Sequence, residues 1–172
     1  MSKIIIPPTY LQKTDAPVIF LAGPIQGTLD WQSKAIEYIK SKDSGLYITS
    51  PRRNVDRNHC RDNFSDEMYH EQVDWETYHL RKAGETGAIL FWLAKEFEHC
   101  RSRAYAQTTR FELGEWKMHH ERGGANLVIG IEDGFTGAKY IKRRLLQDCP
   151  DVTIWSILEK ACDEAIKLAR SE

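Results

Sequence analysis

Short apolar runs alternate with segments of helical period along the chain, and this alternation is the strongest constraint on its fold. Five runs are continuous enough to be buried strands, at residues 18–22, 46–49, 88–93, 127–131 and 152–155. The segments between them predict helices, at about residues 28–42, 65–83, 109–122, 138–147 and from 156 onward. Apolar strands separated by helices indicate a parallel sheet covered on both faces. We therefore expect an α/β fold: a doubly wound, five-stranded parallel sheet of flavodoxin-like order 2-1-3-4-5, in a three-layer α/β/α sandwich.

Length and charge narrow the class of protein. The 172 residues fit a single domain over residues 1–172, and 24 Lys+Arg against 25 Asp+Glu argue against binding a nucleic acid polymer through its phosphates. Because no apolar run approaches the roughly 20 residues of a membrane span, we expect a cytoplasmic protein without a membrane partner. The four cysteines lack C-x-x-C spacing, so reduced thiols and no metal site are expected. A zinc site from the pairs His59-Cys60 and His99-Cys100 is the alternative.

In doubly wound sheets ligands bind beyond the carboxyl ends of the strands, so the residues that follow each strand are the candidates. The first strand is followed by glycines at 23 and 27, which let backbone amides approach an anion or a sugar or simply form a turn. After the second strand, Arg52 and Arg53 are suited to hold a phosphate or carboxylate, unless they only form surface ion pairs. Trp92, at the end of the third strand, is the aromatic residue best placed to stack on a base.

One acidic residue lies on the apolar side of the helix predicted over residues 65–83. Glu76 shares an arc of about 80° with four residues of core type: Tyr69, Val73, Leu80 and Ala83. A carboxylate on an inward face is costly unless it is paired, hydrogen-bonded or protonated. The helix leads into the third strand, so we expect Glu76 to approach the strand-end cleft. The alternative is a buried structural ion pair with Arg52 or Arg53.

A second acidic residue, Glu112, stands near the start of the next helix. Thr109 and Glu112 fit a capping box, which is the structural interpretation. The same position suits a functional role, because a helix N-terminus after the third strand points into the cleft and favours an ionised carboxylate. Gly114 would let a ligand or another backbone come close. An ionised glutamate opposite a second carboxylate is typical of enzymes that cleave glycosidic bonds.

Five segments together resemble nucleoside 2-deoxyribosyltransferases, in the branch whose first loop reads Gly-Pro-Ile. They are Phe20-Leu21-Ala22-Gly23-Pro24-Ile25, Ser50-Pro51-Arg52-Arg53, Gln72-x3-Glu76, Phe91-Trp92-Leu93 and Thr109-Arg110-Phe111-Glu112-Leu113-Gly114. The resemblance implies that the chain passes a 2-deoxyribosyl group between purine or pyrimidine bases, with Glu112 as the nucleophile and Glu76 handling protons on the base. The substrate-binding residues would be Gly23, Pro24, Gln26, Arg52, Gln72, Trp92 and Thr108.

The resemblance also implies no cofactor, a nucleoside and a free nucleobase as partners, and a homo-oligomer. Residues 104–108 lack the glycines with which relatives that hydrolyse 5′-monophosphates hold the phosphate, which favours nucleosides over nucleotides. Two alternatives stay open. The chain could hydrolyse nucleosides or their 5′-monophosphates, or it could sense nucleosides without turnover.

Overall fold

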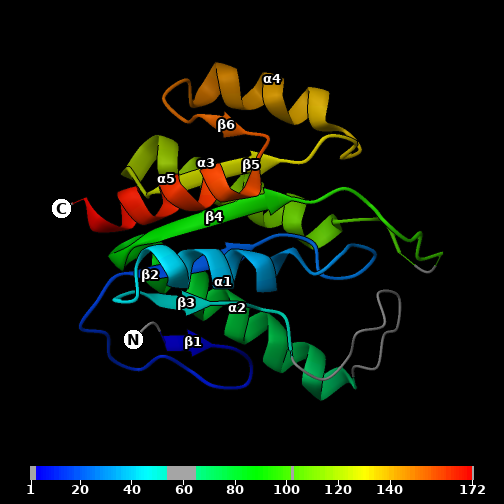
Figure 1. Ribbon diagram of the computed structural model, residues 1–172. Helices are drawn as coiled ribbons and strands as arrows, with labels where there is room; N and C mark the ends of the chain where they lie inside the picture. Colours follow the sequence, from blue (N-terminus) through cyan, green and yellow to red (C-terminus); the bar gives the residue numbers. More distant parts are fainter. Residues whose placement is uncertain (1–2, 54–64, 102, 172) are drawn as a thin grey trace.

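The computed structural model describes residues 3–53, 65–101 and 103–171, in which a parallel sheet lies between two layers of helices (Figure 1). In chain order the elements are β1 (Lys3–Ile5), β2 (Val18–Ala22), α1 (Trp31–Lys42), β3 (Tyr47–Thr49), α2 (Asp66–Thr86), β4 (Ala88–Leu93), α3 (Gln107–Gly123), β5 (Leu127–Ile131), α4 (Ala138–Asp148), β6 (Ile154–Trp155) and α5 (Leu158–Arg170). The strands are arranged in the order β1-β3-β2-β4-β5-β6, and every pair is parallel.

The expected α/β three-layer fold is confirmed, with one strand more than expected. The five predicted strands are β2 to β6, and they lie in the predicted order. The additional strand, β1, extends the sheet at its edge by pairing with β3, with Ile4 opposite Ile48. Its three residues are too few to show the continuous apolar run of a buried strand, and Ile4 is 41% exposed. A short edge strand of this kind carries little signal in the sequence.

The alternation of side chains along the strands divides the core into two halves. On β4, Phe91 and Leu93 face a cluster formed with α2, α3 and α4, whereas Leu90 and Trp92 face a cluster formed with α1 and α5. Figure 1 shows α1 and α5 together in front of the sheet. Because successive residues of a strand point to opposite faces, the strands β2 to β6 each supply both halves of the core. This arrangement places α2 and α3, which carry the two predicted glutamates, on the same face.

The cysteines differ from the expectation of reduced thiols. Cys149 and Cys162 are free and buried, but Cys100 is disulfide-bonded, and its partner lies outside the described residues. The pair at 59–60 also lies outside them. Cys100 therefore offers no thiolate to the alternative zinc site. Within the described ranges, no helix combines the length and apolarity that crossing a membrane requires.

Candidate active site

The two predicted glutamates meet where α2 and α3 pass the carboxyl end of the sheet. Glu76 lies midway along α2, and Glu112 lies in the second turn of α3. The helices touch further along: a Cβ on Gly84 would stand 2.3 Å from the Trp116 ring. Both glutamates are half-buried, and their carboxyl groups lie within hydrogen-bonding reach of each other. Helix contact thus joins two residues that are 36 positions apart in the sequence.

Burial and this contact together make the acidic pair hold a proton. Burial raises the pKa of Glu112 to about 8, and the negative charge of Glu76 adds to the effect. Burial also raises the pKa of Glu76, although hydrogen bonds from Gln72 and Glu112 favour its ionised form. Two carboxylates in contact in a poorly hydrated site cannot both ionise cheaply, so they titrate as a pair. At neutral pH the geometry favours one proton shared between the two carboxyl groups.

Glu76 is held from its own helix, one turn earlier. The Nε2 of Gln72 donates to Oε1 of Glu76 at 2.7 Å and to the carbonyl oxygen of Pro51 at 2.8 Å. The Nε of Arg53 donates to Oε1 of Gln72 at 2.9 Å. The alternative interpretation, a direct ion pair of Glu76 with Arg52 or Arg53, is therefore replaced by an amide that stands between Glu76 and Arg53. Gln72, expected to bind substrate, has its amide engaged within the protein.

Glu112 is not part of a capping box. α3 begins at Gln107, after Ala106, whose backbone is left-handed with φ 54°, and Thr109 is buried inside the helix with 2% of its surface exposed. The capping-box interpretation is therefore wrong, since it placed the helix start two residues too late. Glu112 therefore lies inside the helix rather than at its cap, and its side chain lies within hydrogen-bonding reach of Glu76. Thr108 is exposed in the first turn of α3, one turn before Glu112.

The loop after β2 is shaped by close packing. A Cβ on Gly23 would stand 2.3 Å from the carbonyl oxygen of Trp92 and 2.6 Å from the Trp31 ring, so only glycine fits there. The carbonyl oxygen of Pro24 accepts hydrogen bonds from Nε1 of Trp31 at 2.9 Å and from Nε2 of Gln32 at 3.3 Å. These contacts fix the backbone of the loop against the start of α1. Gln26, further along the loop, accepts a hydrogen bond from Arg103.

The two arginines after β3 are fixed by different partners. The Nε of Arg52 forms an ion pair with Asp30 at 3.0 Å and donates to Oε1 of Gln32 at 3.3 Å. Its Nη2 is buried and finds no hydrogen-bond partner within the described part of the chain. Arg53 pairs with Glu71 as well as with Gln72. Nη2 of Arg52 is thus the arginine donor that best suits a substrate oxygen. Sequence reasoning missed Gln32 and Asp30, whose contacts with Arg52 depend on how α1 returns to β3.

The structure contradicts the expectation that Trp92 stacks on a base. Its side chain is only 5% exposed and belongs to the core half formed with α1 and α5, on the far side of the sheet from the acidic pair. It packs against Gly130 of β5, where a Cβ would stand 2.2 Å from the ring. The alternation along β4 decides this orientation, because Phe91 and Leu93 take the face of α2 and α3.

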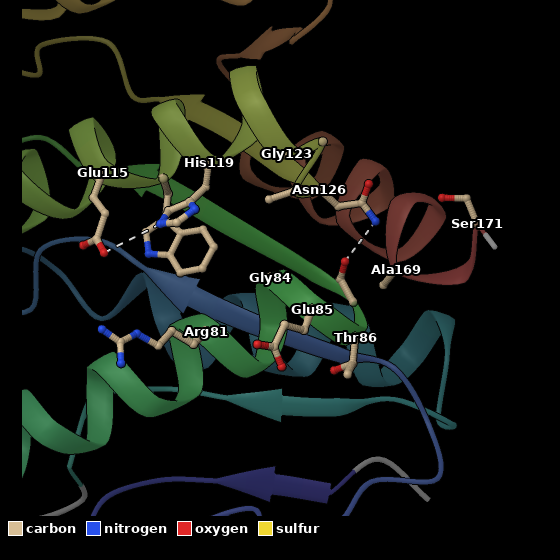
Figure 2. Close-up of a pocket in the computed structure, with 14 residues that line it drawn as sticks. Arg81, Gly84, Glu85, Thr86, Glu115, His119, Gly123, Asn126, Ala169 and Ser171 are labelled. Carbon is tan, nitrogen blue, oxygen red and sulfur yellow. Dashed lines mark hydrogen bonds and ion pairs between the residues drawn. The ribbon is translucent and has the colours of Figure 1, made fainter.

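A cavity of about 740 Å³ lies at the opposite, amino end of the strands (Figure 2). It is lined by the ends of α2 and α3 together with Asn126, just before β5, and Ser171, after α5. Figure 2 shows Glu115 and His119 projecting from α3 toward this region. Neither Glu76 nor Glu112 lines it. Across the described residues, no group of three or more His, Cys, Asp or Glu side chains is placed to hold a metal ion.

Comparison with known proteins identifies a family for most of this structure. The profile of the family described as "Nucleoside 2-deoxyribosyltransferase like" matches residues 16–135, from the start of β2 to just beyond β5. A search of proteins with curated functions finds no match. Among solved structures, a conserved protein from Enterococcus faecalis V583 is similar in fold, with a TM-score of 0.52 and 15% identity over 88% of this chain and 98% of that one.

Proposed function

The chain belongs to the nucleoside 2-deoxyribosyltransferase-like family, and we propose that it transfers a 2-deoxyribosyl group from one nucleobase to another through a covalent intermediate on Glu112. Membership by itself supports a function related to nucleosides. The finer proposal rests on the direct meeting of Glu76 and Glu112 at the carboxyl end of the sheet. One proton held between two glutamates meets the needs of this reaction, which uses a carboxylate nucleophile and an acid for the leaving base.

In the first half-reaction the proton passes from Glu112 to Glu76 as the nucleoside enters. The ionised carboxylate of Glu112 then attacks C1′ of the sugar, and the N-glycosidic bond breaks with its electron pair going to the base nitrogen. Glu76 gives the proton to that nitrogen, so the base leaves neutral. In the second half-reaction the incoming base attacks C1′, Glu112 departs as a carboxylate, and Glu76 takes the proton from the base. Two inversions give net retention.

The sugar must part the two carboxyl groups. Retaining glycosidases hold their carboxyls about 5–5.5 Å apart, whereas here the two groups are in direct contact. Substrate entry therefore breaks the contact. Because the proton then passes to Glu76, the negative charge that adds to the raised pKa of Glu112 is removed, which favours ionisation of the nucleophile.

The proposal also includes assembly of the chain into a homo-oligomer, by analogy with related enzymes. Exposed apolar side chains stand beside the acidic pair on both helices: Val73 on α2 is 42% exposed and Phe111 on α3 is 79% exposed. Burying such side chains is favourable, at about 25 cal/mol per Å² of apolar surface. Light scattering coupled to size exclusion would show a dimer or larger assembly, and Phe111→Ser would shift it toward monomer. A monomeric wild-type protein at micromolar concentration would contradict this part.

The test is base exchange. Deoxyinosine is incubated with the protein, with and without free adenine. Transfer predicts deoxyadenosine only when adenine is present, and a 2-fluoro-2-deoxy nucleoside should leave its 2-fluoro-2-deoxy sugar on Glu112, detected by mass spectrometry and absent from Glu112→Gln. Free sugar in both tubes would indicate hydrolysis instead. Nucleoside binding without any turnover would indicate a sensing protein.

A further inference from the structure

We propose that Gln72 is a positioning residue that holds Glu76 as the proton acceptor of the pair, leaving the resting proton on Glu112. The inference deepens the proposed function and rests on it for its catalytic consequence. It concerns the side chain that links the segment after β3 to the acidic pair. Gln72 and Glu76 are four residues apart on α2, so they lie on the same face of that helix.

The partners of Gln72 fix which way its amide points. An arginine can only donate, and a carbonyl oxygen can only accept. The Nε of Arg53 must therefore meet the amide oxygen, and Pro51 must meet the amide nitrogen, as the distances of 2.9 and 2.8 Å show. The second N–H of the nitrogen is left for Glu76, 2.7 Å away. A flipped amide would lose all three bonds, so Gln72 offers Glu76 only a donor.

The N–H that Gln72 donates to Glu76 determines which carboxyl group of the pair carries the shared proton. Hydrogen bonds to a carboxylate favour its ionised form, and Glu76 receives one from Gln72. The groups that face the pair are Gln72 from α2, with Arg53 behind it from the segment after β3, and Glu115 from α3, which adds negative charge near Glu112. Each of these favours ionisation of Glu76 or protonation of Glu112. The proton therefore moves from Glu112 to Glu76 only when an entering substrate changes these surroundings.

The experiment compares Gln72→Met, which keeps length and shape but donates nothing, with Gln147→Met, the same change at an exposed position of α4. The first readout needs no activity: carbon NMR of ¹³C-labelled glutamate carboxyls follows the titration of Glu76 and Glu112, assigned through Glu76→Gln and Glu112→Gln. We expect Gln72→Met to raise the apparent pKa of Glu76 by about one pH unit and to lower that of Glu112. A hydrogen bond to a charged group shifts the equilibrium between its ionised and protonated forms by roughly a factor of ten or more. Gln147→Met should change neither.

The second readout is the pH profile of deoxyribosyl transfer. Gln72→Met should lower kcat about ten- to a hundredfold with a smaller change in KM, and should move the limbs of the pH profile in the directions of the NMR shifts. A normal pH profile and unchanged NMR titration in folded Gln72→Met would overturn the inference. If the wild-type protein performs no transfer, the proposed function fails, and the NMR titration alone decides the position of the proton. If Gln72→Met does not fold, Arg53→Met, which frees the amide to turn, should give smaller shifts of the same sign, and unchanged titration there would also overturn the inference.

Discussion

The α2–α3 pair carries polar and charged groups at both ends of the sheet, and the two ends differ in how those groups are satisfied. At the carboxyl end, the carboxyl groups of Glu76 and Glu112 are in contact, and the pKa of each is raised. At the amino end, the cavity of about 740 Å³ is lined in part by groups that bond within the protein, Asn126 among them (Figure 2). There, Nδ2 of Asn126 donates to the carbonyl oxygens of Gly87 at 3.0 Å and Leu168 at 3.1 Å.

This difference is the basis on which we propose the carboxyl end as the reactive site and assign the amino end a structural role. The cavity alone would suggest an active site at the amino end. The chemistry suggests the carboxyl end, because acidic groups with raised pKa values lie there beside the carboxyl ends of the strands. The bonds of Asn126 instead tie the end of α2 to the end of α5. We expect changes at the carboxyl end to alter activity and changes at the amino end to alter stability.

The largest effect should come from Glu112→Gln. The amide keeps a donor for Glu76 but cannot attack C1′, so transfer should fall at least about a thousandfold, as for other nucleophiles removed singly. Steady-state base exchange measures the loss. Glu121→Gln, near the end of α3 and paired there with Lys117 at 3.2 Å, is the matched control and should change the rate little. Substantial transfer by Glu112→Gln would remove the distinction between the two ends.

Glu76→Gln should have the next largest effect. It removes the group that passes the proton to the leaving base, and general acid–base residues typically contribute about 10²–10⁴-fold. The loss should shrink for substrates whose base leaves readily without a proton. Glu85→Gln, on the same helix at the cavity, serves as the control. A large loss of stability with normal turnover would instead return Glu76 to a structural role.

Gly84→Ala tests the amino end. A Cβ there would stand 2.3 Å from the Trp116 ring, so the helices must separate or the ring must move. Overpacking of this kind costs about 1–3 kcal/mol of unfolding free energy. Denaturant unfolding measures the cost, while kcat per folded molecule should stay near that of the wild type. A strong fall in kcat at full folding would show that the amino end also governs the chemistry.

The smallest effect is a pH dependence of stability. Because folding raises the pKa of Glu112 from 4.5 to about 8, its contribution to stability is complete below about pH 4.5 and is lost as pH rises through about 8. Relative to the wild type, Glu112→Gln should therefore gain stability with rising pH, on the order of 1 kcal/mol, since water entering an opened pair relieves part of the cost. Unfolding of both proteins between pH 5 and 9 checks the sign. A constant difference would mean that the carboxyls do not share a proton.

Much of the fold could be predicted because each of the predicted strands is a run of consecutive apolar residues, which can be recognised without knowing what it packs against. The run Ala88–Leu93 is apolar throughout and buried throughout, and its place in the sheet follows from general rules of parallel connections. The site was less predictable. Tyr69 and Val73 share the helical arc of Glu76 and resemble core residues, yet they are exposed at 57% and 42%, because the first half of α2 extends past the sheet. Periodicity gives the face of a helix but not how much of that face is covered.

The amino-acid sequence by itself determined the α/β class, the order of the five predicted strands and the presence of glutamates on the helices that flank the third of them. Each depends on neighbours within a few residues and on general rules of chain connection. Only the tertiary structure decided that Glu76 and Glu112 touch, that Gln72 takes its partners from 19 and 21 residues away, and that Trp92 turns to the other face. These outcomes depend on helix and strand packing, where a shift of one residue changes which side chains meet, and local sequence does not encode that packing.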